Sequence, residues 1–197
     1  MSKFIALFPL NVILLPGERM RLHIFETRYK QLINECVDMD KNLGIPFVRL
    51  SKLTGTGSEV RVSKVINHYA NGEMDIEIEG VKIFQLMDFQ DPFPGKLYAG
   101  GNTSTIENID VTDENRFVSF VRTFYRSVYE KPIASSALDN FKIFDVALLL
   151  NLNHEQKFEL LHQDSQRAKI NFLVHQMRFL LLVKDQEKKL NNNFLLN

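Results

Sequence analysis

The chain has 197 residues and an apolar fraction of 45%, enough for one domain or for two small subdomains that share a core. Basic and acidic residues number 24 each, so the formal net charge is zero and no basic stretch marks a nucleic-acid partner. One cysteine, Cys36, excludes an internal disulfide. Neither a secretory signal nor an apolar run of the roughly 20 residues that cross a bilayer is present, so we expect a soluble, cytoplasmic protein.

The first 110 residues carry the pattern of a β-rich subdomain. Pro9 and Pro16 separate two short apolar stretches, at residues 6–8 and 12–15, which predict short or edge strands. Residues 26–38 then change to helical spacing. The apolar stripe of this predicted helix consists of Tyr29, Leu32, Ile33, Cys36 and Val37.

A hairpin follows in the same subdomain. Residues 59–69 and 74–79 alternate apolar and polar side chains, and Asn71-Gly72 between them predicts a type I′ turn. We expect a strand at 43–50 and, because 51–58 is rich in Gly, Ser and Thr, a mobile exposed loop after it.

Two further strands complete the predicted β-rich subdomain. They lie at residues 80–89 and 96–106, with Pro92 and Pro94 between them. The total is about six strands and one helix.

Residues 111–190 predict an all-helical bundle of about four helices, and 191–197 a tail. Pro132 separates the first two helices, whose apolar stripes run over 117–128 and 138–148. Asn153 predicts the N-cap of a short third helix, with Gln156 at the third helical position.

Asp164 can cap the fourth helix. Its stripe runs from Ile170 to Leu181 and dissolves in the charged residues 184–189. In the tail, Phe194, Leu195 and Leu196 are apolar enough to dock on the core or on a second copy.

Residues 8–17, Phe-Pro-Leu-Asn-Val-Ile-Leu-Leu-Pro-Gly, followed by 22–29, Leu-His-Ile-Phe-Glu-Thr-Arg-Tyr, are similar to the opening of the Lon N-terminal domain family. The family is the substrate-recognition module of ATP-dependent Lon proteases. The hairpin and the helical segments 145–150 and 156–161 follow in family order. Two departures are Ile83, where the family commonly has arginine, and residues 103–119, which match no family pattern.

The resemblance implies an α+β fold: a PUA-like pseudo-barrel of strands with one helix, followed by the helical bundle. It also implies a module that binds polypeptide. Since no ATPase or protease region follows up to Asn197, we expect a non-catalytic protein.

The residues themselves predict no catalytic site, metal site or cofactor. Residues 55–57 are not a P-loop, because no Gly-Lys-Ser or Gly-Lys-Thr follows. Cys36 lies on an apolar helix stripe, which favours a packed thiol over a nucleophile. The five histidines show no spacing typical of metal ligands.

The candidate peptide-binding residues lie in the family-like opening: His23, Phe25, Glu26, Arg28 and Tyr29. In a functional interpretation, Arg28 offers a forked donor and Tyr29 a flat amphipathic ring to a bound peptide. In a structural interpretation, Glu26 complements the helix dipole, Arg28 pairs with it and Phe25 packs inward.

The leading hypothesis is binding of unfolded or extended polypeptide, or of a protein partner. Recognition would use strand addition, the loop at 51–58 and an apolar groove between the subdomains. Self-association through the helical half and the apolar tail is the alternative. A third hypothesis is small-molecule or RNA binding through the PUA-like barrel. The neutral net charge argues against RNA.

Overall fold

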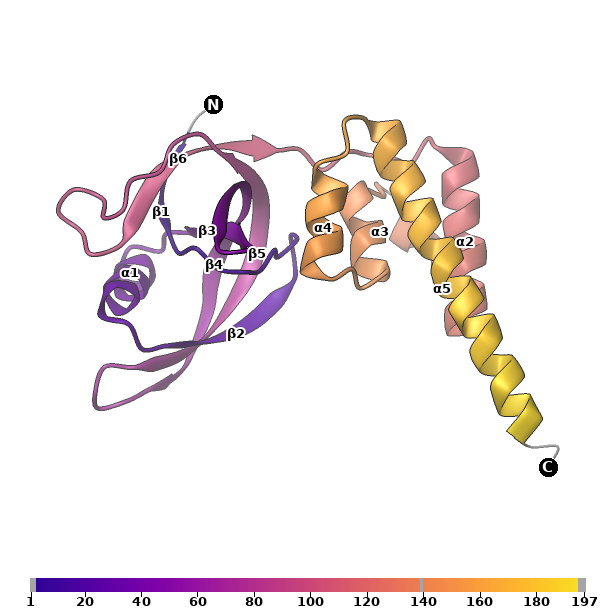
Figure 1. Cartoon of the computed structure of the whole chain (residues 1–197), viewed down its shortest axis with the longest axis horizontal. Helices are drawn as coiled ribbons and strands as arrows, with labels where there is room; N and C mark the ends of the chain where they lie inside the picture. The colour runs from indigo at the N-terminus through magenta and orange to yellow at the C-terminus, as the bar shows by residue number, and fades with distance from the viewer. Residues whose placement is uncertain (1–2, 139, 195–197) are drawn as a thin grey trace. The chain divides into compact units, whose positions relative to one another are not determined.

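The computed structural model describes residues 3–138 and 140–194 (Figure 1), and contacts between Cα atoms divide the chain into two compact units. Unit 1 is Met1–Glu107 and holds all six strands and one α-helix. Unit 2 is Asn108–Asn197 and is helical. Over the described residues, no helix is both long and apolar enough to cross a bilayer.

Five strands of unit 1 close into a barrel, and a sixth lies outside it. The sheet order is β2-β5-β4-β3-β1-β6, and β6 pairs back onto β5, which closes the ring between them. Neighbouring strands are antiparallel except β1 and β3, which are parallel. The strands are β1 (Lys3–Leu7), β2 (Arg19–Ile24), β3 (Leu43–Arg49), β4 (Lys52–His68), β5 (Met74–Leu86) and β6 (Ala99–Ile106).

The core of unit 1 forms where the helix α1 (Thr27–Asp38) packs on the strands. Residues 74–80 of β5 alternate buried and half-buried, as expected for strands with one face in the core. From α1, the buried side chains are Tyr29, Leu32, Ile33 and Cys36. The predicted α+β class, with a pseudo-barrel and one helix, is confirmed.

The predicted mobile loop at 51–58 is wrong. β4 begins at Lys52 and pairs with β3 on one side and β5 on the other, so this polar stretch lies within the barrel wall. Ser58 is fully buried, where its Oγ accepts a hydrogen bond from the backbone N–H of Leu14 at 2.9 Å. A polar residue tolerates burial when its hydrogen bonds are made, and composition alone does not reveal them.

The predicted strand at 12–15 is also wrong. Its residues Ile13, Leu14 and Leu15 are buried, yet they join no strand ladder. The strand that the sequence analysis missed is β2, which pairs with residues 74–79 of β5. Residues 80–89 do not form a separate strand, because β5 runs without a break to Leu86.

The hairpin between β4 and β5 is confirmed, but its turn is not type I′. Of the pair Asn71-Gly72, Gly72 alone has a positive φ, of 76°. The backbone N–H of Tyr69 bonds to the carbonyl of Glu73 across a three-residue loop, in which one left-handed glycine suffices. Positive φ angles at both turn residues occur instead at Leu50 and Ser51, between β3 and β4.

Unit 2 contains four α-helices, the predicted number. They are α2 (Asn115–Tyr129), α3 (Ile143–Leu149), α4 (His154–Leu161) and α5 (Gln166–Phe194), with a short 3₁₀ helix at Ser135–Leu138. Asn153 caps α4 and Gln156 closes the capping box, as the sequence predicts.

Three details of unit 2 differ from the predictions. The apolar stripe at 138–148 belongs to two elements, the 3₁₀ helix and α3, rather than to one helix. Ser165, not Asp164, caps α5 by accepting a bond from the N–H of Ala168. α5 continues through the charged residues to Phe194. Leu195 and Leu196 of the predicted docking tail lie outside the described residues.

We expect Gly80→Ala to destabilise unit 1 by about 1–3 kcal/mol. A Cβ at this position would lie 2.2 Å from the carbonyl oxygen of Leu15, and that backbone is held by hydrogen bonds between Gly80 and residues 17 and 18. Gly55→Ala is the matched control, since its Cβ would meet only the flexible amide end of Gln85. Urea denaturation measures both, and equal midpoints for the two variants would contradict the close approach at Gly80.

Candidate functional site

His23, from the predicted site, lies in a polar cluster on β2 and β5. Its Nδ1 is 2.7 Å from the carboxylate of Asp75 and its Nε2 is 3.4 Å from that of Glu73. Tyr69 donates its hydroxyl to Asp75 at 2.6 Å. The bonds that Asp75 accepts, above all the one from Tyr69 and also the one from His23, lower the pKa of Asp75 to about 2. The same bond to Asp75 raises the pKa of His23. Phe25 is 60% exposed, with its ring centroid 6.2 Å from that of His23.

The other three predicted residues form a separate group at the start of α1. Arg28 donates to Glu26 at 3.0 Å, and its guanidinium lies 4.5 Å above the ring of Tyr29. Tyr29 itself is buried and stacks on Phe8 with a centroid distance of 3.8 Å. The structure therefore gives Tyr29 a place in the core, and the other four predicted residues, His23, Phe25, Glu26 and Arg28, keep substantial exposure.

One face of α1 holds the connection between β5 and β6, residues 87–98. Gln31 accepts the backbone N–H of Leu97 at 3.0 Å. Glu35, one turn later, accepts from Lys96 at 2.7 Å and from the hydroxyl of Tyr98 at 2.6 Å. These bonds fix the end of a long, proline-containing connection against a regular helix.

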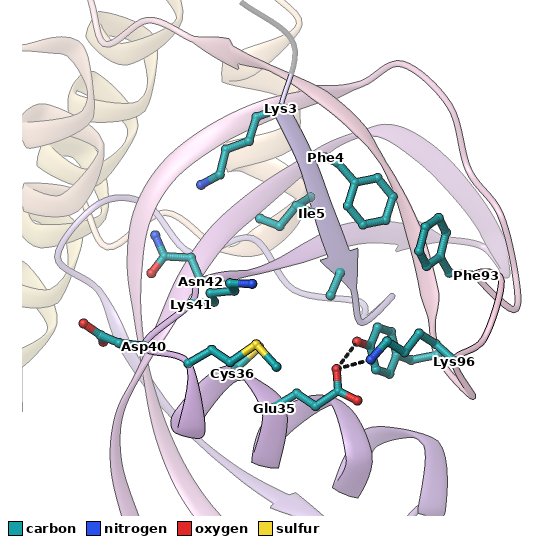
Figure 2. A pocket seen from close by; sticks show the side chains of 13 residues that line it. Lys3, Phe4, Ile5, Glu35, Cys36, Asp40, Lys41, Asn42, Phe93 and Lys96 are labelled. Carbon is teal, nitrogen blue, oxygen red and sulfur yellow. Dashed lines mark hydrogen bonds and ion pairs between the residues drawn. The ribbon is translucent and has the colours of Figure 1, made fainter.

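A pocket of about 510 Å³ opens beside this contact, and Figure 2 shows its lining. We call it the β1–α1 pocket, because β1 forms one wall and the C-terminal half of α1 another. The lining residues are Lys3, Phe4, Ile5, Ala6, Glu35, Cys36, Met39, Asp40, Lys41, Asn42, Phe93, Lys96 and Tyr98.

The walls of the β1–α1 pocket are largely apolar and aromatic. Phe4 and Phe93 lie with ring centroids 4.4 Å apart, and both rings are visible on one side of the pocket in Figure 2. Phe4 is 45% exposed and Met39 is 54% exposed, although each lies beside buried core residues. The pocket thus offers exposed apolar surface on rigid elements, the usual character of a binding site.

Three ionisable groups that line the pocket, Glu35, Cys36 and Tyr98, have shifted pKa values. Bonds from Lys96 and Tyr98, drawn dashed in Figure 2, lower the pKa of Glu35. Burial raises the pKa of Cys36 to about 11, so the thiol stays protonated at neutral pH and is a poor nucleophile. Burial, with the bond to Glu35, also raises the pKa of Tyr98.

Sequence reasoning missed the β1–α1 pocket because its walls are distant in the chain. Phe4, Met39 and Phe93 belong to three separate segments and share no local motif. The only signal in the sequence was that β1 and the proline-containing β5–β6 connection hold more apolar residues than a short strand and a loop need. In the part of the chain that the structure describes, no three His, Cys, Asp or Glu side chains gather as a metal ion requires.

The His23–Asp75 pair should make stability depend on pH. Because the pKa of His23 is raised on folding, the pair contributes fully below the unfolded value near 6.5, as long as Asp75 stays ionised, and loses its contribution as pH rises through the folded pKa of His23. We expect Asp75→Asn to lower the pKa of His23, measured from imidazole chemical shifts by NMR. Asp88→Asn is the control, since Asp88 bonds to Asn102 instead. An unchanged His23 pKa in the Asp75 variant would refute the pairing.

Solved structures of Lon N-terminal domains have a fold similar to that of this chain. The structure of a Lon N-terminal domain protein from Xanthomonas campestris matches with a TM-score of 0.58 and 22% identity, over 91% of this chain and 98% of that one. The N-terminal domain of Lon protease from the Mycobacterium avium complex matches with a TM-score of 0.62 and 14% identity, over 89% and 98%. Curated protein sequences gave no match. The model of the ATP-dependent protease La (LON) substrate-binding domain matches residues 5–178, and this chain belongs to that family.

Proposed function

We propose that this chain binds extended or unfolded polypeptide, without catalysis of its own, by taking an apolar side chain into the β1–α1 pocket. The observation that carries the proposal is the exposure of Phe4 and Met39 around a pocket of about 510 Å³. Membership in a substrate-binding family supports the same conclusion.

Contacts within the protein hold the walls of the pocket in place, which favours binding. Phe4 is on β1, a strand paired on both edges, and Phe93 is in a connection that α1 fixes through Glu35. A ligand side chain therefore meets an ordered surface, and little ordering entropy opposes its entry. The apolar walls tolerate several side-chain types, as a module that accepts many unfolded segments requires.

The polar rim can hold the backbone of the bound segment. Lys96 uses one donor on Glu35, and Lys3 uses one on Glu59 at 3.0 Å. Each ammonium group carries three donors, so donors remain for peptide carbonyl oxygens. Backbone contacts of this kind do not depend on sequence, which again suits varied clients.

A binding role agrees with the states of the polar groups. Among the described lining residues, the carboxylate of Glu35 is occupied by Lys96 and Tyr98, and the thiol of Cys36 is protonated at neutral pH. A nucleophile with an adjacent base is the minimum for covalent hydrolysis, and this pair does not supply it.

We expect the double variant Phe4→Ser/Met39→Ser to bind an uncharged apolar peptide about tenfold more weakly. Full burial of a Phe or Met side chain stabilises a complex by about 1.5–3 kcal/mol, and about half of each of these two side chains is exposed to a ligand. The probe is a fluorescent peptide with Leu and Phe at its centre and Gly and Ser on both sides. Fluorescence anisotropy gives the dissociation constant.

Met87→Ser is the matched control, because Met87 is 63% exposed but does not line the β1–α1 pocket. Circular dichroism melts establish that all variants remain folded. Equal affinity of the double variant and the unmodified chain, or an equal loss in the Met87 variant, would exclude this pocket as the site.

A further inference from the structure

Unit 2 contains an open groove between α2 and α5, separate from the β1–α1 pocket of unit 1. The groove has a volume of about 690 Å³. Its floor is apolar and is built from Phe117 and Phe120 of α2 with Ile170 and Val174 of α5. Phe117 is buried, whereas the other three are only half-buried, so the floor keeps apolar surface that a ligand can cover.

Three arginines stand around this α2–α5 groove. Arg116, Arg167 and Arg178 are all exposed and line it. The guanidinium of Arg178 lies 5.9 Å from the ring centroid of Phe120, which orients it over the floor. The only carboxylate in the lining, Glu114, accepts a bond from Gln166 at 3.3 Å.

The cations of the α2–α5 groove differ from several others in unit 2. Lys184 and Lys188 pair with Glu130, and Lys169 donates to three carbonyl oxygens at the end of α4. Among the described residues, none of the three groove arginines has a carboxylate within ion-pair distance. Three guanidinium groups and one carboxylate, that of Glu114, therefore lie at one apolar surface, which leaves a local excess of positive charge.

The helix directions add to this positive potential. Glu114 meets Gln166 at one end of the helix pair, and Val128 meets Lys184 toward the other, so α2 and α5 run parallel. Their N-termini thus lie together, and neither helix has an acidic residue in its first turn. Arg116 and Arg167 lie in these first turns, where the helix dipole disfavours a cation and favours a bound anion.

We propose that the α2–α5 groove binds a polypeptide segment in which an apolar side chain is flanked by Asp or Glu. The apolar side chain covers the floor, and the flanking carboxylates pair with the arginines. A guanidinium fork matches a carboxylate in two parallel hydrogen bonds, which gives geometric selectivity as well as charge. The net charge of the whole chain is zero, so this preference comes from a local arrangement.

The site is independent of the proposed function of unit 1. The variants separate the two sites, since Phe4→Ser/Met39→Ser changes the β1–α1 pocket and Arg116→Gln/Arg167→Gln changes the α2–α5 groove. Because the two sets of variants share no residue, failure of one site leaves the other test intact.

The test measures fluorescence anisotropy of a labelled peptide with Leu and Phe at its centre and Asp and Glu on both sides. A matched peptide carries Lys in place of the acidic residues. We expect the acidic peptide to bind, the basic one to bind at least about fivefold more weakly, and Arg116→Gln/Arg167→Gln to weaken acidic-peptide binding by about fivefold. Arg122→Gln/Arg126→Gln is the control, since these arginines lie on α2 but outside the groove.

Several outcomes would overturn the proposal. Equal affinity for the acidic and basic peptides would remove the charge selectivity. Unchanged binding in the Arg116/Arg167 variant, or an equal loss in the Arg122/Arg126 control, would remove the groove as the site. A single-stranded oligonucleotide that bound more tightly than the acidic peptide and was lost in the same variant would replace the peptide with a nucleic acid.

Discussion

The closure of the barrel at β5 is the constraint on which unit 1 depends. β5 pairs with β4 along its whole length, with β2 through residues 74–79 and with β6 through residues 83–86. At Gly80, between these two partners, the backbone N–H and carbonyl bond to residues 18 and 17. One strand thus changes its neighbour halfway along, which closes the ring and leaves β2 outside it.

Closure of the barrel also limits the free strand edges of unit 1. Five of its strands have both edges occupied, so the hydrogen-bonding edges that attract an added strand are largely removed. The proposed binding of polypeptide therefore uses side-chain surface rather than strand addition. The contact between α1 and the β5–β6 connection shapes this surface, because Glu35 holds Lys96 and Tyr98 in place and the ring of Phe93 lies beside that of Phe4 on one side of the β1–α1 pocket.

Local signals predicted the parts of the fold that local forces decide. The apolar stripe of α1, the Asn153 cap and the alternation of β5 each reflect contacts within a few residues, and each was predicted from the sequence. Two of the errors arose where residues distant in the chain determine the structure. The polar stretch around Ser58 is a strand because β3 and β5 satisfy its backbone, and residues 12–15 are buried without a ladder.

The same distinction applies to the candidate site. The sequence pointed to His23 through Tyr29, a contiguous motif, and the structure divides it between a polar cluster, an ion pair and the core. The β1–α1 pocket combines Phe4, Met39 and Phe93, which no single segment brings together. These residues line one pocket because the barrel fold places β1 beside α1 and the β5–β6 connection.

An NMR titration with the uncharged apolar peptide tests the central claim most directly, because it locates the contact in the intact chain. We expect the backbone amide shifts to change at Phe4, around Cys36 to Met39 and from Phe93 to Tyr98. Changes confined to His23, Phe25 and Arg28, or to the helices of unit 2, would contradict it.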